Sequence, residues 1–356
     1  MVVQRRAFFS NRIFSKINLR VLIVLLFLLG TVLGGFLKPI PVFAASDSNA
    51  GYIIYVPLTS SDDSGFSPPE IPSPEEGWLA YLNYYRAVGG LQPVTENKSW
   101  GEGGWYHSRY MVKNNVIGHE EDPNNRWYTN QGDMAARSSN LLASSDKYAD
   151  DRYAIDSWMQ APFHAVMILN PALEQVGYGS FHSEDGGFQM GAALDVIRGL
   201  GNLPSSVRFP VTWPANGTTI PLGEHWGEDP EPLTSCPGYK APSGIPVILQ
   251  IGPGSLPPVV SASDFQHGNK KLEHCLIDGT NYANPDEAAR DLGRSILSNS
   301  NAIVLIPRNP LTPGETYQVS ITVNGQAYHW SFRVAGKASS STTSLSLESA
   351  RPAFSP

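Results

Sequence analysis

The first regular pattern of apolar and polar residues predicts an amphipathic helix that begins near residue 73. The tetrapeptide Ser-Pro-Glu-Glu at 73–76 offers an N-cap serine, a proline at the first helical position and a glutamate at the third, which is the pattern of a capping box. Trp78, Leu82 and Tyr85 follow at helical spacing, and the Gly-Gly pair at 89–90 ends the predicted helix.

Three further helical patterns come before residue 162. One spans about 98–114 and contains three interior glycines, each of which costs about 1 kcal/mol relative to alanine, so close packing against a neighbouring element must offset them. These glycines are Gly101, Gly103 and Gly104. The other two patterns occupy about 131–144 and 150–161, and Pro162 is expected to end the latter.

From Val176 onward the apolar period changes from helical spacing to alternation. The segments VGYGSF (176–181) and FQMGAALDV (188–196) flank the turn SEDGG, which predicts an antiparallel hairpin. Helices followed by strands indicate an α+β domain over residues 73–200.

Short strands punctuated by proline and glycine dominate residues 203–335. The clearest is a hairpin over 317–334, in which apolar residues alternate on both sides of an Asn-Gly turn at 324–325. Its apolar positions are Tyr317, Val319, Ile321, Val323, Tyr328, Trp330, Phe332 and Val334. Such a face must pack on another sheet, so a β-sandwich is predicted. The Ser/Thr-rich tail at 336–356 is expected to be disordered.

The N-terminal residues have the pattern of an export signal. Residues 1–45 hold six basic and no acidic residues, and an apolar run of 17 residues, 21–37, follows the basic cluster. Val42 and Ala44 suit a cleavage site, so a signal peptide over 1–44 and a linker over 45–72 are predicted. An uncleaved membrane anchor is the alternative. After cleavage, no stable membrane insertion is expected of a secreted or surface-associated chain.

Charge and composition narrow the class of protein. The 356 residues include 25 basic and 32 acidic side chains, for a net charge of −7. Without residues 1–45 the balance is 19 basic against 32 acidic, which argues against nucleic acid as a partner. The length fits two domains.

Cys236 and Cys275 are the only cysteines. Two thiols cannot form a four-thiolate zinc site, and in an oxidising compartment the simplest arrangement is a disulfide. Two free buried thiols are the alternative. Closing a loop of this length is worth about 4 kcal/mol in the chain-entropy model.

Histidines supply the chemical signal, and three of the eight stand out. His107 lies in the second predicted helix, His119 follows it beside three acids, and His164 comes just after a helix break. Spacing alone favours structural roles, because neither an HExxH motif nor a His-x-x-x-His pair occurs.

An ordered set of short motifs resembles a known family. These are NYYR at 83–86, HSRYMVKNNVIGH at 107–119, SSN at 138–140, WMQAPFH at 158–164 and VGYG at 176–179. Together they resemble a bacterial CAP domain, of the superfamily of cysteine-rich secretory proteins, antigen 5 and pathogenesis-related proteins of class 1. The resemblance implies an α–β–α sandwich with a cleft. It is accompanied by a similarity of residues 310–332 to bacterial Ig-like modules.

The same resemblance implies where a site lies. His119 and His164 match the two cleft histidines, which in many members join two glutamates around a divalent metal such as zinc. Here Ser139 and Ala161 stand at the positions of those acids. Glu121 or His107 could substitute. The candidate cleft residues are therefore His107, His119, Glu121, Ser139, Asn140 and His164. His119 and His164 are the candidate metal ligands; no cofactor is assured, and a divalent metal such as zinc is the candidate.

The leading hypothesis is a secreted bacterial CAP-domain protein that binds a lipid, a peptide or an envelope glycan without catalysis. Ser139, His119 and Glu121 contain the residue types of a nucleophile, a base and an orienting acid, but no nucleophile motif surrounds the serine. One alternative is therefore an extracellular hydrolase, with or without a metal, that acts through His119 and His164. A structural or adhesive envelope protein is the other alternative.

Overall fold

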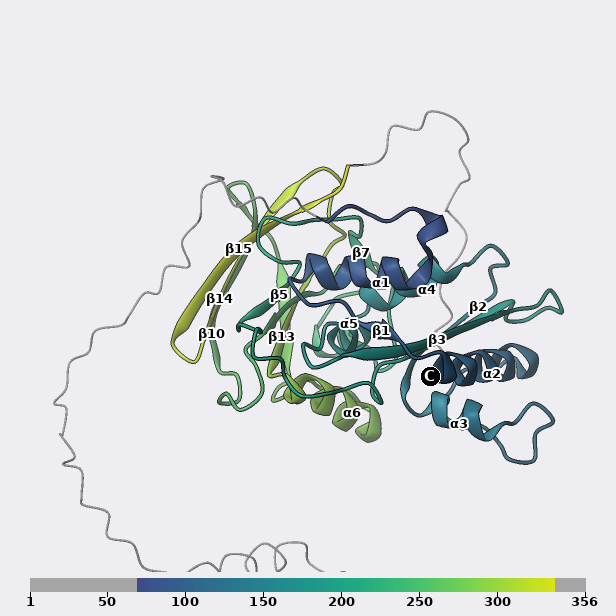
Figure 1. The fold of residues 1–356 in the computed structure, drawn as a ribbon. Coiled ribbons are helices and arrows are strands. Elements are labelled where there is room, and N and C mark those ends of the chain that lie inside the picture. Colours follow the sequence, from purple (N-terminus) through teal and green to yellow (C-terminus); the bar gives the residue numbers. More distant parts are fainter. Residues whose placement is uncertain (1–68, 337–356) are drawn as a thin grey trace, which may run out of the picture. The chain divides into compact units, whose positions relative to one another are not determined.

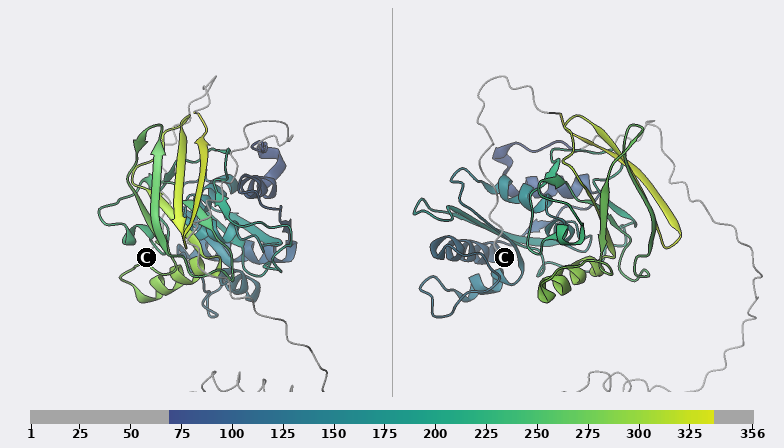
Figure 2. Two further views of the ribbon diagram at one scale, coloured as in Figure 1. Left: turned by 90° about the vertical axis from the view of Figure 1, so that its left-hand side faces the viewer. Right: turned by 180° about the vertical axis from the view of Figure 1, so that it is seen from behind.

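The computed structural model describes residues 69–336, in which helices and strands occur as an α+β segment followed by β-sheets (Figures 1 and 2). The predicted capping box is present: Glu76 Oε1 accepts a hydrogen bond from Ser73 N at 2.7 Å. A short 3₁₀ turn, η1 (Pro74–Glu76), leads into α1 (Gly77–Val88), which ends before the glycine pair as predicted. The predicted signal peptide, the linker up to residue 68 and the tail from 337 lie outside the described residues.

The second predicted helix is confirmed as α2 (Lys98–Asn114), and its glycines allow it to approach a sheet closely. A Cβ atom added at Gly101 would lie 2.8 Å from Tyr178 O, and one at Gly104 would lie 3.0 Å from Gly179 N. Both carbonyl and amide belong to strand β3 (Gln175–His182). The helix backbone therefore rests directly on the strand, which is the close packing that the glycines predict.

Four strands form the sheet under α2, in the order β1-β3-β4-β2. The predicted hairpin is confirmed as β3 and β4 (Met190–Asp195), which pair antiparallel, while β1 (Thr95–Glu96) pairs parallel to β3. Figure 1 shows α2 and α3 (Asn130–Ala136) on one side of this sheet and α1 and α4 (Asp151–Met159) on the other.

The helix predicted over 131–144 is wrong in its second half. Residues Ser139–Ser144 form strand β2, which pairs with β4. All six residues of β2 are buried, with Leu141 packed in one apolar cluster and Leu142 in another. A strand that is covered on both faces lacks alternation, so its sequence cannot be distinguished from a helix by periodicity.

Pro162 begins a new helix shortly after the preceding one ends. Helix α4 stops at Met159, and Pro162 occupies the first turn of a new helix, α5 (Pro162–Ile168). His164 therefore lies at the start of a helix and not in a loop after one.

The second half contains two larger sheets, with the orders β11-β10-β14-β15-β6 and β12-β13-β9-β5, and a two-stranded sheet of β7 (Glu224–His225) and β8 (Ser243–Gly244). The predicted hairpin is confirmed as β14 (Thr316–Val323) and β15 (Gln326–Val334), with Asn324 and Gly325 at positive φ in the turn. The remaining strands of these sheets are β5 (Val211–Trp213), β6 (Thr219–Ile220), β9 (Val247–Gln250), β10 (Val260–His267), β11 (Lys270–Lys271), β12 (His274–Asp278) and β13 (Ala302–Pro307).

A helix that the sequence pattern did not predict, α6 (Glu287–Asn299), lies before β13. Asp286 caps its first turn by accepting a hydrogen bond from Ala289 N at 2.8 Å. Ala289, Leu292 and Ile296 recur at helical spacing after Asp286, so the pattern of an amphipathic helix is present in the sequence, within a segment otherwise typical of short strands. The predicted all-β segment therefore includes one helix.

Side chains of the two halves share one hydrophobic cluster. Tyr85 of α1 meets Trp213 of β5 edge to face with ring centroids 5.6 Å apart, and Phe163 of α5 meets Tyr282 in the same way at 4.9 Å. Buried Gln250 donates a hydrogen bond to Leu169 O at 3.0 Å. These contacts cross the division near residues 200–203 that the sequence predicts, and this boundary stays a prediction.

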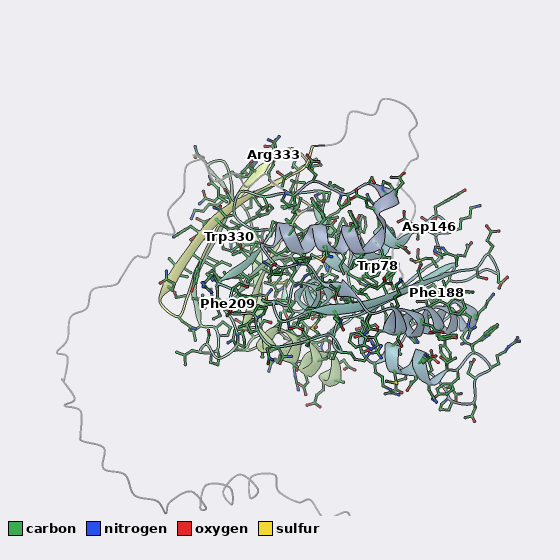
Figure 3. All side chains as sticks on the ribbon, viewed as in Figure 1. Trp78, Asp146, Phe188, Phe209, Trp330 and Arg333 are labelled. Atoms are coloured by element: carbon green, nitrogen blue, oxygen red, sulfur yellow. A yellow bond between two sulfur atoms is a disulfide. The ribbon has the colours of Figure 1, made fainter. Side chains whose placement is uncertain are left out.

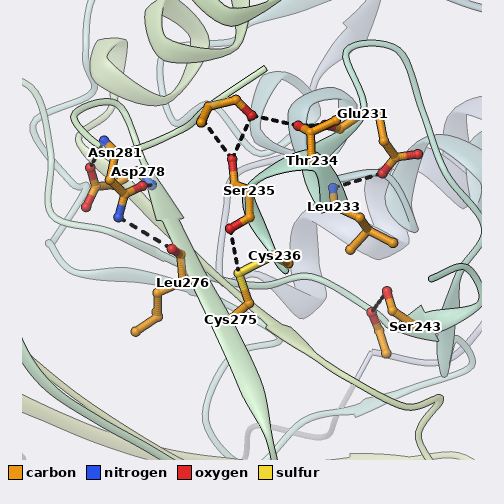
Figure 4. Close-up of a disulfide and its surroundings, with 12 residues drawn as sticks. Glu231, Leu233, Thr234, Ser235, Cys236, Ser243, Cys275, Leu276, Asp278 and Asn281 are labelled. Carbon is orange, nitrogen blue, oxygen red and sulfur yellow. Dashed lines mark hydrogen bonds between the residues drawn. A yellow bond between two sulfur atoms is a disulfide. The ribbon is translucent and has the colours of Figure 1, made fainter. Parts of the chain in front are cut away.

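The predicted disulfide between Cys236 and Cys275 is confirmed (Figure 4). It joins the end of the 3₁₀ turn η2 (Pro232–Ser235) to β12. Around it, Thr234 Oγ1 and Ser235 Oγ donate hydrogen bonds to Ala283 O at 2.7 and 3.0 Å. Tyr282 Oη donates to Glu231 O at 3.0 Å. The segment around 231–236 is thus held to the loop after β12 covalently and by hydrogen bonds.

None of the helices within residues 69–336 is both long and apolar enough to cross a membrane.

Replacing both Cys236 and Cys275 by serine is expected to lower the free energy of unfolding by about 4 kcal/mol, because the 39-residue loop is then open in the unfolded chain. Denaturant unfolding of the oxidised wild type and the double variant measures the difference. The reduced wild type should match the variant. A difference below about 1 kcal/mol would show that the bond does not constrain the chain as the loop length predicts.

Candidate functional site

The site is built around His164, which occupies the third position of α5. Its Nδ1 atom lies 2.6 Å from Glu228 Oε2, and 12% of its side chain is exposed. The same carboxylate accepts hydrogen bonds from Phe163 N at 2.9 Å and from His164 N at 3.3 Å. The side chain of Glu228 is fully buried, so these three donors replace the hydrogen bonds that water would make to its carboxylate.

Glu228 acts as the missing N-cap of α5. The cap position itself is Ala161, whose side chain cannot accept a hydrogen bond, and no capping bond is made there. The first backbone N–H groups of a helix need acceptors, and an acid also interacts favourably with the helix dipole. Glu228, 64 residues after His164, provides both the acceptor and the negative charge at the start of α5. It also orients the imidazole of His164.

The segment that carries Glu228 is fixed from both sides. Strand β7 (Glu224–His225) pairs with β8 (Ser243–Gly244), and the buried His225 has its Nδ1 2.8 Å from Gln160 O. Downstream, Glu231 O accepts from Tyr282, whose ring packs on Phe163. The carboxylate is therefore positioned by elements of the second half and not by a free loop.

His119 lies in the loop after α2, within range of the charges of His164 and Asp229. Its Nδ1 lies 2.8 Å from Ala136 O, so that nitrogen must carry the proton. Part of the side chain remains exposed, yet burial by its surroundings lowers the pKa below its ordinary value of 6.5. Charges on His164 and His107 lower it further, whereas the hydrogen bond to Ala136 and the carboxylate of Asp229 raise it. These effects favour the neutral form of His119.

The two imidazoles present the same chemistry. Each donates Nδ1–H to a fixed acceptor, which leaves Nε2 unprotonated in the neutral ring. No hydrogen-bond partner for either Nε2 occurs among the described residues. When both rings are neutral, each presents an oriented Nε2 acceptor, and the carboxylate of the exposed Asp229 acts on the charge of His119.

Two of the candidate residues lie together in the interior. The side chains of His107 and Glu121 are fully buried and form an ion pair at 3.0 Å. His107 Nε2 also lies 2.9 Å from Gly118 O, and Thr129 N donates to Glu121 Oε2 at 3.0 Å. This pair anchors the loop that carries His119, and neither side chain is open to a ligand.

The remaining candidates are on strand β2. Asn140 Nδ2 donates to His164 O at 3.2 Å, so it supports α5 through the backbone. Ser139 Oγ is buried without a hydrogen-bond partner in the described part of the chain. It makes no hydrogen bond to a histidine, which is the contact that a serine nucleophile would need.

The donor set does not fit a divalent metal ion. Within residues 69–336 there is no group of three or more His, Cys, Asp or Glu side chains that could hold one. Glu121 is turned toward His107, and Glu228 already accepts three hydrogen bonds. Two imidazole nitrogens remain, fewer than the three protein ligands of catalytic zinc sites.

Sequence reasoning missed Glu228 and Asp229, which follow His225-Trp226-Gly227 in a loop. One signal was available: Pro162 begins a helix whose cap position is alanine, so an acceptor from elsewhere is needed. The sequence offers no way to choose that acceptor among the acids of the second half.

Residues 79–194 match the model of the cysteine-rich secretory protein family, CAP, in agreement with the resemblance of the motifs. Among solved structures, an extracellular protein containing a SCP domain from Bacillus anthracis str. Ames is similar, at 20% sequence identity and a TM-score of 0.26. The match covers 33% of this chain and 38% of that chain, so this protein spans well under half of that relative's length. No curated protein matches the chain.

Glu228→Ala is expected to lower the free energy of unfolding by about 1–3 kcal/mol, because it removes the cap of α5 and one partner of His164. Glu184→Ala, at an exposed acid, is the matched control and should change it by less than about 0.5 kcal/mol. Denaturant unfolding, with the ring-nitrogen NMR signals of His164, measures both effects. Unchanged stability and unchanged His164 signals in Glu228→Ala would contradict the assignment.

His119 is expected to titrate below pH 6.5. Its folded pKa is lowered, so its contribution to stability is present above the unfolded value and is lost as pH falls through the folded pKa. Asp229→Asn should lower this pKa further and His164→Gln should raise it, since each removes one of the charges that act on His119. NMR titration of the ring signals tests this, and a midpoint at or above 6.5 in the wild type would refute it.

Proposed function

Residues 79–194 form a CAP domain of the cysteine-rich secretory protein family, and on this premise we propose that the protein is an extracellular ligand-binding protein whose site lies at His119 and His164. The observation that carries the proposal is the pair of oriented Nε2 acceptors described above. They favour a ligand rich in hydrogen-bond donors.

Among ligand classes, a hydroxyl-rich glycan of the cell envelope suits these acceptors better than a lipid chain, which has no donors. A peptide offers N–H donors and is the nearer alternative. Each Nε2 acceptor that meets a matching hydroxyl gains a directional hydrogen bond, whereas a ligand without donors displaces water from the nitrogen and returns no hydrogen bond.

Export of the chain is part of the same proposal. The basic and apolar pattern of residues 1–44 supports a signal peptide, and the Cys236–Cys275 disulfide suits an oxidising compartment. The sheets of residues 203–335 would serve as an Ig-like module. Through Glu228, that module also contributes to the site.

Binding of a tetramer of N-acetylglucosamine by isothermal titration calorimetry tests the proposal. His119→Gln and His164→Gln are each expected to raise Kd about ten-fold or more, because each removes an imidazole acceptor. His182→Gln, at an exposed position, is the matched control and should leave Kd within about two-fold. A short peptide and a lysophospholipid are the comparison ligands. Equal losses in all three variants, or saturable binding of the lipid alone, would refute the glycan assignment.

A hydrolase is the second candidate, and the His164–Glu228 contact at 2.6 Å favours it. A carboxylate that holds Nδ1–H leaves Nε2 able to take a proton from an attacking water or hydroxyl. Product release from the same glycan, lost in His164→Gln and kept in His182→Gln, would replace the binding proposal by this one. A structural or adhesive role predicts neither saturable binding nor turnover.

A further inference from the structure

Cationic and aromatic side chains alternate along the outer surface formed by α2, the loop before α3 and β3. Arg109 Cζ lies 5.0 Å from the ring centre of Trp105 and 5.2 Å from that of Trp127. The other face-to-cation contacts are Arg126 with Trp127 at 4.6 Å and Lys113 with Phe181 at 5.6 Å. Trp105 and Phe181 meet edge to face at 5.6 Å. We call this series the cation–aromatic ladder; its members are Arg126, Trp127, Arg109, Trp105, Phe181 and Lys113.

Arg109 is the central member of the ladder. Besides the two tryptophans, Tyr106 flanks its guanidinium at 5.2 Å. Its Nε atom is buried and has no hydrogen-bond partner among the described residues. The three surrounding rings exclude water from part of the guanidinium and restrict its orientation. Its terminal N–H groups are therefore positioned to donate to a planar acceptor such as a carboxylate.

Among the cations of the ladder, Lys113 has an acidic partner and the two arginines have none among the described residues. Lys113 pairs with Asp185, and Tyr106 Oη donates to Glu102 at 3.2 Å. Neither Arg109 nor Arg126 forms an ion pair with any described residue. These two guanidinium groups therefore keep their positive charge unpaired on one surface of a chain whose residues 46–356 hold 19 basic and 32 acidic side chains.

We propose that the cation–aromatic ladder binds an acidic polysaccharide. A guanidinium group donates two parallel hydrogen bonds to a carboxylate, and the C–H groups of the sugar rings contact the edges of the aromatic rings that the cations leave uncovered. A linear chain of uronic acid units repeats both features along its length, as the ladder does. The proposal does not depend on the site at His119 and His164.

An anionic membrane fits this surface less well. Cations cover the ring faces, and among the three ladder aromatics only Trp105 is exposed beyond a third, at 38%. Little apolar area is therefore left to enter a bilayer, whereas a polymer needs only the ring edges and the outward N–H groups.

The experiment measures binding of the full secreted chain to immobilised polygalacturonate by biolayer interferometry at about 0.15 M salt. The double variant Arg109→Gln/Arg126→Gln is expected to raise Kd about ten-fold or more, and Arg126→Gln alone, at an exposed position, to raise it measurably. Arg333→Gln removes an exposed arginine at the end of β15 and is the matched control, with a change within about two-fold (Figure 3). Circular dichroism melting checks the fold of each variant.

Neutral dextran, polyglutamate and vesicles of phosphatidylcholine with phosphatidylglycerol are the comparison arms. Binding of polygalacturonate that exceeds all three supports the proposal. No binding of polygalacturonate, equal binding of dextran, tighter binding of polyglutamate or vesicles, or an equal loss in Arg333→Gln overturns it. His119→Gln should bind polygalacturonate like the wild type, which separates failure of this proposal from failure of the proposed function.

Discussion

The carboxylate of Glu228 is the constraint on which the candidate site depends. A buried carboxylate is tolerated only when donors replace its water, and here those donors are two backbone N–H groups of α5 and the imidazole of His164. The helix in turn has no cap of its own. The helix therefore supplies hydrogen-bond donors to the carboxylate, and the carboxylate supplies the acceptor that the first turn of the helix lacks. The orientation of His164 is set by Glu228 more than by the local sequence of α5.

Features that rest on short-range chemistry could be predicted from the sequence. The capping box before α1, the glycine-rich contact surface of α2 and the Asn-Gly hairpin of β14 and β15 all depend on neighbouring residues, and all three are present. Prediction was wrong for β2, because both of its faces are covered and alternation is lost. It missed α6 because the surrounding segments are rich in short strands, proline and glycine, although an N-cap aspartate and apolar residues at helical spacing are present.

Two members of the candidate site rest on the resemblance of the motifs, and their role stays a prediction. His119 and His164 were found through the order of motifs, and the structure gives both the same tautomer, but spacing alone would not have joined them. His107 and Glu121 had the residue types of a site and belong instead to a buried pair that holds the His119 loop. Glu228 could not be predicted, since a contact over 64 residues leaves no periodic trace.

The contact between His164 and Glu228 limits how the two segments of this chain can be exchanged by recombination. Domains with separate cores can be exchanged by recombination, because a breakpoint in the linker leaves every contact within one parent. Here a breakpoint between residues 200 and 224 would part an imidazole from its carboxylate and a helix from its cap. The two segments must therefore be inherited as a pair, and a CAP domain transplanted from another lineage would need its own acid to arrive with it.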